Sequence, residues 1–166
     1  FADAFPGDHW TFVHRPRPSE VPLEPAVREH QRQWDQMMSA YCGGRASCLD
    51  LAVELIHQTQ RRSPGAPLRV LDVGCGSGSF VQRLLAEHRL APVSVAGVDG
   101  SARSLLLAAA LSGDARFERA DIASPGWAAA FESESFDVVF LGWVTHEIEP
   151  WRLGSLYEEI GRVLRH

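Results

Sequence analysis

The chain has 166 residues and a hydrophobic content of 45%, enough for one buried core. Its net charge of −5 and pI of about 5.8 argue against bulk attraction to nucleic acid or to acidic membranes. No apolar run approaches the roughly twenty residues of a membrane span, so no membrane association is expected.

The three cysteines, Cys42, Cys48 and Cys75, are few and odd in number, which fits a reducing compartment and predicts a cytoplasmic protein. Cys42 and Cys48 lack partners at metal-ligand spacing, so no metal site is predicted. Cys75 lies within a glycine-rich loop, where a small filler is a simpler interpretation than a nucleophile.

The N-terminal part divides into an arm and two helices. Five prolines within residues 1–25 predict an irregular arm. Apolar residues at helical spacing predict helices over 26–41 and 46–61, and the proline-rich stretch 63–67 ends the second of them. We expect residues 1–65 to form a lid or the substrate side, and residues 66–166 to form the core.

The core alternates strands and helices, which predicts an open parallel α/β sheet with right-handed crossovers and strand order 3-2-1-4. The strands are expected at 69–73, 93–98, 115–119 and 136–141, and the helices at 78–89, 102–111, 126–131 and 152–165.

The first strand runs directly into three alternating glycines, Gly74, Gly76 and Gly78. Glycine lets the backbone turn tightly and approach a ligand where a Cβ would clash. A helix that opens near Ser77 offers backbone N–H groups to ligand oxygens. The pattern predicts the first unit of a nucleotide-binding sheet.

The second strand stops at Asp99, placed to accept hydrogen bonds from both hydroxyls of a ribose. The alternative is that Asp99 or Ser101 only caps the helix that follows. The dinucleotide fingerprint would require a glycine at 79, where this chain has Ser79, so a nicotinamide-dependent oxidoreductase is disfavoured.

Four segments in order resemble the class I S-adenosylmethionine-dependent methyltransferases, whose sheet is Rossmann-like: LDVGCGSG, VAGVDGS, ARFERADI and FDVVFLGWVTHEI. The resemblance implies S-adenosylmethionine as cofactor, with the glycine loop holding its methionine part, Asp99 its ribose, and Asp121 and Ile122 its adenine. The implied cofactor-binding set is Asp72, Gly74, Cys75, Gly76, Gly78, Asp99, Gly100, Asp121, Ile122 and Trp143. Within it, Asp72 either braces the glycine loop or reaches the cofactor's amino group, and Trp143 either walls the methyl-transfer site or packs in the core.

Methyl transfer needs a base only where the acceptor must lose a proton. The candidate is His146, beside Glu147 in the loop after the fourth strand, because imidazole accepts a proton near neutral pH. The alternative is that residues 145–147 start a helix with Thr145 as its cap. We expect a methyltransferase acting on a small molecule, under a lid that the N-terminal aromatic residues would suit. The alternative is a binding or scaffold module of the same fold without activity.

The resemblance also implies a sheet of seven strands, of which this sequence supplies four, so the C-terminal strands are absent from this chain. Either the natural chain is longer and its C-terminal segment is missing here, or a partner chain completes the sheet.

Overall fold

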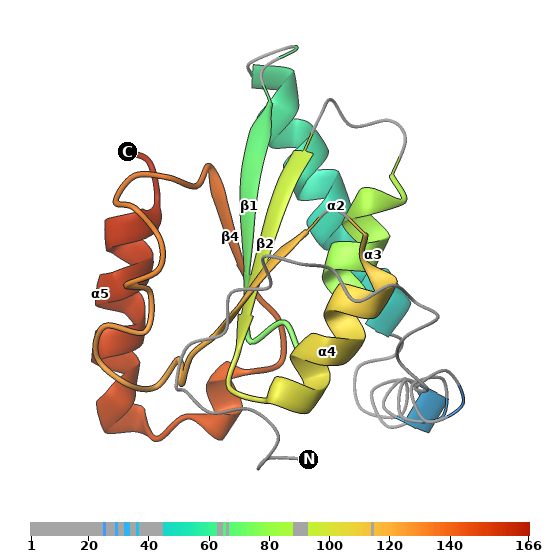
Figure 1. Cartoon of the computed structure of the whole chain (residues 1–166). Coiled ribbons are helices and arrows are strands. Elements are labelled where there is room, and N and C mark those ends of the chain that lie inside the picture. The colour runs from blue at the N-terminus through green and yellow to red at the C-terminus, as the bar shows by residue number, and fades with distance from the viewer. Residues whose placement is uncertain are drawn as a thin grey trace.

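The computed structural model describes residues 45–62, 65, 67–87, 93–113 and 115–166, together with single helical residues at 25, 29, 32, 33 and 36. Its centre is a four-stranded sheet in which every pairing is parallel, in the order β3-β2-β1-β4 (Figure 1). The strands are β1 (Leu68–Val73), β2 (Val93–Asp99), β3 (Arg116–Arg119) and β4 (Val138–Leu141). The predicted fold class and strand order are confirmed.

Helices cover both faces of the sheet (Figure 1). One face carries α2 (Arg45–Arg62), α3 (Ser79–Leu85) and α4 (Ala102–Leu111). The other face carries α5 (Leu153–Val163). Because parallel strands need crossover connections, this two-sided cover follows from the alternation of strands and helices in the sequence.

The core divides into two hydrophobic clusters, one on each face of the sheet. Val70 packs with the α2, α3 and α4 layer, whereas Leu71 and Val73 face α5. In α5 the buried residues Leu156, Ile160 and Val163 recur at the spacing of one helical face. The sheet is therefore buried on both sides, which explains why its first two strands are almost continuously apolar.

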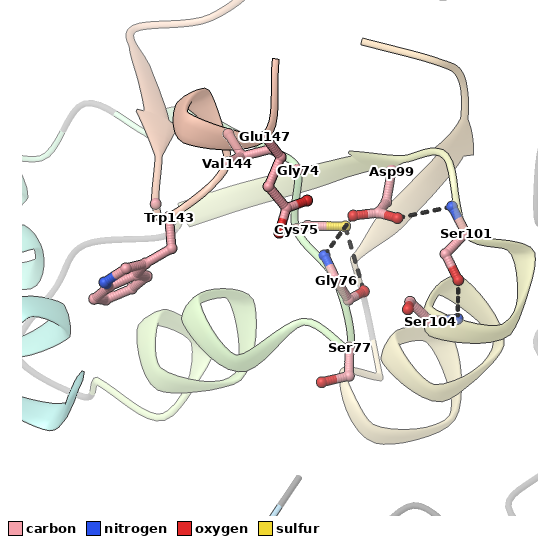
Figure 2. A pocket seen from close by; sticks show the side chains of 11 residues that line it. Gly74, Cys75, Gly76, Ser77, Asp99, Ser101, Ser104, Trp143, Val144 and Glu147 are labelled. Carbon is pink, nitrogen blue, oxygen red and sulfur yellow. Dashed lines mark hydrogen bonds between the residues drawn. The ribbon is translucent and has the colours of Figure 1, made fainter. Parts of the chain in front are cut away.

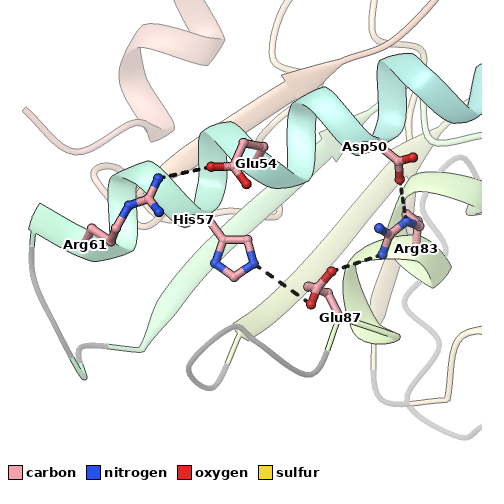
Figure 3. Close-up of polar contacts among 6 residues, drawn as sticks. All are labelled: Asp50, Glu54, His57, Arg61, Arg83 and Glu87. Atoms are coloured by element: carbon pink, nitrogen blue, oxygen red, sulfur yellow. Dashed lines mark hydrogen bonds and ion pairs between the residues drawn. The ribbon is translucent and has the colours of Figure 1, made fainter.

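Ion pairs tie α2 to α3 and to the residues that follow it (Figure 3). Arg83 lies between Asp50, at 2.9 Å, and Glu87, at 3.4 Å. The Nε2 of His57 lies 3.9 Å from Glu87, whose side chain is only 8% exposed. Together with the buried Leu49, Val53 and Ile56 of α2, these contacts make α2 part of the core layer.

Several predicted boundaries shift, and one element is wrong. The short helix predicted over 126–131 is a run of turns, in which Gly126 has a φ of 75° that a right-handed helix cannot contain. The predicted helix 78–89 ends at Leu85. The predicted strand 136–141 begins only at Val138, because Phe136 pairs instead with Leu164 in an isolated bridge. That same bridge ends α5 at Val163, earlier than predicted.

The N-terminal arm and most of the helix predicted over 26–41 lie outside the described residues. The helix predicted over 46–61 is confirmed as α2. No helix in the described part of the chain has the length and apolar character that crossing a membrane requires.

Gly97 of β2 gives a prediction about stability. A Cβ at this position would lie 2.8 Å from the Sγ of Cys75 and from the ring of Phe117, both of which are buried. We expect Gly97→Ala to lower the free energy of unfolding by about 2 kcal/mol, because overpacking a filled core forces its neighbours to shift.

The matched control is Gly161→Ala on α5, where a Cβ meets nothing within 4 Å. It should stabilise the protein by up to about 1 kcal/mol through helix propensity. Urea denaturation of both variants measures the two changes, and equal stabilities would contradict the packing argument.

Candidate functional site

The glycine loop after β1 is held against the end of β2 by its own backbone. The N–H groups of Gly74 and Cys75 both donate to the carbonyl of Val98, at 2.8 and 3.1 Å. Gly74, Gly76 and Gly78 all have positive φ, between 53° and 78°. A Cβ on Gly74 would lie 2.5 Å from the side chain of Val144. The missing side chain therefore lets the loop after β4 pack against the glycine loop.

Asp99 connects the glycine loop to α4. Its Oδ2 accepts a hydrogen bond from the N–H of Gly76 at 2.9 Å, and its Oδ1 accepts one from the N–H of Ser101 at 2.8 Å. Ser101 itself caps α4 by accepting from the N–H of Ser104 at 3.2 Å. Of the two cap candidates in the sequence, Ser101 takes that role, so Asp99 is not needed as the cap.

The charge on Asp99 is unfavourable for the fold. Burial raises the pKa of this carboxyl, and the negative charge of Glu147 raises it further, while the two backbone N–H bonds act against both. Each carboxylate oxygen still has a lone pair available, because each accepts only one of the two bonds. A perturbed acid with spare acceptor capacity beside a glycine loop is typical of a binding site.

A pocket of about 290 Å³ opens above these residues, between the ends of β1, β2 and β4 (Figure 2). Asp99 lies at one end and Trp143 at the other, with the glycine loop along one side. Trp143 has a φ of 57°, which is uncommon for a bulky residue and occurs most often at functional sites. The lining is Gly74, Cys75, Gly76, Ser77, Asp99, Ser101, Ser104, Gly142, Trp143, Val144 and Glu147.

Cys75 is 5% exposed despite its place in this lining. Burial raises the pKa of its thiol well above the ordinary value, and Asp72 and Asp99 raise it further. The sulfur therefore stays protonated and fills space, as a buried structural cysteine does.

The turn after β3 lies beside Asp99, because the N–H of Ala120 donates to the Asp99 carbonyl at 3.2 Å. In this turn Asp121 accepts from the Ser124 hydroxyl at 2.6 Å and pairs with Arg152 at 3.1 Å. These partners lower the pKa of Asp121, with Ser124 contributing most. Ile122 is buried in the cluster that faces α5.

The pocket thus brings together five of the predicted site residues: Gly74, Cys75, Gly76, Asp99 and Trp143. Of the others, Asp72 is buried in β1, Gly78 precedes α3, and Gly100 joins β2 to α4. Asp121 and Ile122 follow β3. His146 lies in a single 3-10 turn, Thr145–Glu147, with its side chain 66% exposed. None of these six is part of the pocket lining.

Several lining residues were not in the predicted set, notably Ser101, Ser104, Val144 and Glu147. The two serines carry a helix-cap signal rather than a ligand signal in the sequence, and Val144 has none. Arg152, which joins the start of α5 to Asp121, had no local signal because 31 residues separate the two.

The sequence comparison decides the family. A family model described as a methyltransferase domain matches residues 70–166. The chain belongs to this methyltransferase family. No curated protein has a sequence that matches it.

Solved structures show the same fold. A TehB-like S-adenosylmethionine-dependent methyltransferase from Corynebacterium glutamicum is 19% identical, with a TM-score of 0.58 and coverage of 85% of this chain and 68% of its own. The YcgJ protein of Bacillus subtilis is 21% identical, with a TM-score of 0.57 and coverage of 74% and 47%. Against YcgJ, this methyltransferase chain thus spans about half of the relative's length.

A third structure, phosphoethanolamine N-methyltransferase 2 of Haemonchus contortus, was solved in complex with S-adenosylmethionine. It is 26% identical, with a TM-score of 0.54 and coverage of 74% of this chain and 26% of its own. The prediction that S-adenosylmethionine is the cofactor is confirmed for this methyltransferase family.

The residues of this chain fit that cofactor. Gly76 borders open space, because a Cβ at this position would meet nothing within 4 Å. The absence of a side chain leaves that space to a ligand. Each carboxylate oxygen of Asp99 can accept one more hydrogen bond, which suits a pair of ribose hydroxyl donors. In the described part of the chain the lining carries two carboxylates, those of Asp99 and Glu147, and neither lysine nor arginine, which suits a ligand with cationic groups.

Proposed function

We propose that this chain binds S-adenosylmethionine at the C-terminal ends of β1 and β2 and transfers its methyl group to a small-molecule acceptor. The observation that carries the proposal is the contact between the glycine loop and Asp99, which fixes a nucleoside-sized opening at the switch point between β1 and β4. When bound, the cofactor supplies a methyl group already activated by a positively charged sulfur.

The described residues divide the binding work among them. Asp99 holds the ribose hydroxyls with the acceptor positions that Gly76 and Ser101 leave free. The glycine loop places its backbone against the methionine part, and Asp72 beneath it braces the loop or meets the amino group. Asp121 and Ile122 lie beside Asp99 and line the adenine side, with Arg152 holding the Asp121 turn in place.

The acceptor side is proposed to lie over Trp143 and His146, under the lid that the sequence predicts within residues 1–65, although α2 of that range belongs to the core layer. The loop after β4 approaches the glycine loop through Val144 and Gly74, which places Trp143 and Glu147 on the pocket wall. The loop after β4 aligns the acceptor atom with the methyl group and excludes water. His146 takes a proton only from an acceptor that has to lose one.

Calorimetric titration tests the proposal. We expect S-adenosylmethionine and S-adenosylhomocysteine to bind the purified chain with one site each, and NAD to show no binding, because Ser79 replaces the third glycine of the dinucleotide fingerprint. NAD binding without S-adenosylmethionine binding would overturn the proposal. Failure of all three ligands would favour the scaffold alternative.

A further inference from the structure

Glu147 places a second carboxylate in the pocket, on the side opposite α4. It ends the 3-10 turn Thr145–Glu147, which its own N–H stabilises by donating to the Val144 carbonyl at 3.1 Å. Figure 2 shows its carboxylate directed toward the glycine loop and the side of the pocket that holds Asp99. The two carboxylates are close enough to interact, because Glu147 is among the causes that raise the pKa of Asp99.

The fold gives little reason for a charge at this position. Among the described residues, the recorded ion-pair partner of Glu147 is His146, whose Nε2 lies 3.9 Å from Oε1, and both side chains are about two-thirds exposed, at 66% and 64%. An exposed pair at this distance contributes almost nothing to stability. The repulsion of Asp99 is unfavourable, and none of the described residues that line the pocket is a cation that could offset it. A cationic ligand would offset this repulsion.

We propose that Glu147 shifts cofactor binding toward the form that carries a positive charge on sulfur. This inference rests on the proposed function. On methyl transfer the S–CH3 bond breaks and its electron pair stays on sulfur, so the cationic sulfonium becomes a neutral thioether while adenine and ribose are unchanged. In the proposed complex Asp99 meets the ribose, which the reaction does not change. Glu147 lies on the β4 side of the glycine loop. We assign it to the sulfur, whose charge the reaction changes.

The size of the effect follows from Coulomb's law. An attraction between a carboxylate and a sulfonium at a partly exposed site corresponds to about a 3- to 10-fold change in affinity, after allowance for solvent screening. The neutral product lacks this attraction, so Glu147 raises the affinity for the substrate form relative to the product.

The test compares dissociation constants of the wild type and Glu147→Gln for three probes. These are S-adenosylmethionine, S-adenosylhomocysteine, and a stable analogue with an ammonium group in place of the sulfonium. We expect E147Q to weaken the two cationic probes about 3- to 10-fold and to leave S-adenosylhomocysteine within about twofold. The matched control is Glu158→Gln on α5, because Glu158 is exposed and does not line the pocket. It should change none of the three.

The outcomes separate this inference from the proposed function. Equal weakening of all three probes by E147Q would mean that Glu147 only shapes the pocket, and would overturn the inference. Unchanged constants would overturn it as well, although the proposed function would stand. If the wild type bound none of the three probes, the proposed function itself would fail.

Discussion

Replacing Asp99 by alanine is expected to weaken S-adenosylmethionine binding by about 3 kcal/mol, or roughly 100-fold in Kd. In the proposed binding mode the change removes two hydrogen bonds from ribose hydroxyls to a charged acceptor, and each such bond contributes about 1.5–3 kcal/mol. It also releases the N–H of Gly76, which Asp99 holds at 2.9 Å, so the glycine loop loses one of its anchors to β2. Calorimetry with S-adenosylhomocysteine measures the loss without any need for an acceptor.

Two variants sharpen this result. Asp99→Asn keeps the shape and one acceptor oxygen, and should give an intermediate loss. Asp50→Ala removes an exposed carboxylate on α2 that pairs with Arg83 at 2.9 Å and does not line the pocket. This variant should leave the affinity unchanged. If Asp99→Ala kept wild-type affinity, the ribose would be held elsewhere and the assignment of this pocket would be wrong.

The sheet and the glycine loop were predictable because their signals are local. An apolar strand followed by three alternating glycines dictates a turn with positive φ, and the structure has positive φ at all three. Asp99 was predictable because a residue that ends a parallel strand lies at the edge where ligands bind. The turns at 126–131 were mistaken for a helix because Gly126 was not recognised as left-handed.

The rest of the site depends on contacts that the sequence does not mark. Arg152 reaches back 31 residues to Asp121, and Val144 fits the space that Gly74 leaves open. Trp143 has a left-handed φ of 57°, which its residue type does not predict. Such pairings arise from the packing of β4 beside β1, and nothing in the spacing of the individual residues reports them.

Replacing His146 by alanine is expected to lower kcat by a factor on the order of 10² to 10⁴ for an acceptor that has to lose a proton, with cofactor affinity nearly unchanged. His146 follows β4, whose C-terminal end adjoins the glycine loop across the switch point, so its side chain starts from the acceptor side of the pocket. Its exposure of 66% leaves the ring accessible to an incoming acceptor. An acceptor amine that arrives neutral should be methylated by the variant at close to the wild-type rate, because no base is then required.

The measurement follows conversion of S-adenosylmethionine to S-adenosylhomocysteine with a hydroxyl acceptor and with an amine acceptor side by side. His166→Ala is the matched control, because His166 is exposed and lies two residues after Leu164. Leu164 pairs with Phe136 before β4 begins, at the end of the strands away from the pocket. This variant should slow neither acceptor. A general base has to reach the proton directly or through one water, so an unchanged rate with the hydroxyl acceptor in His146→Ala would exclude this imidazole as the base. An equal loss with both acceptors would instead assign His146 to positioning the acceptor.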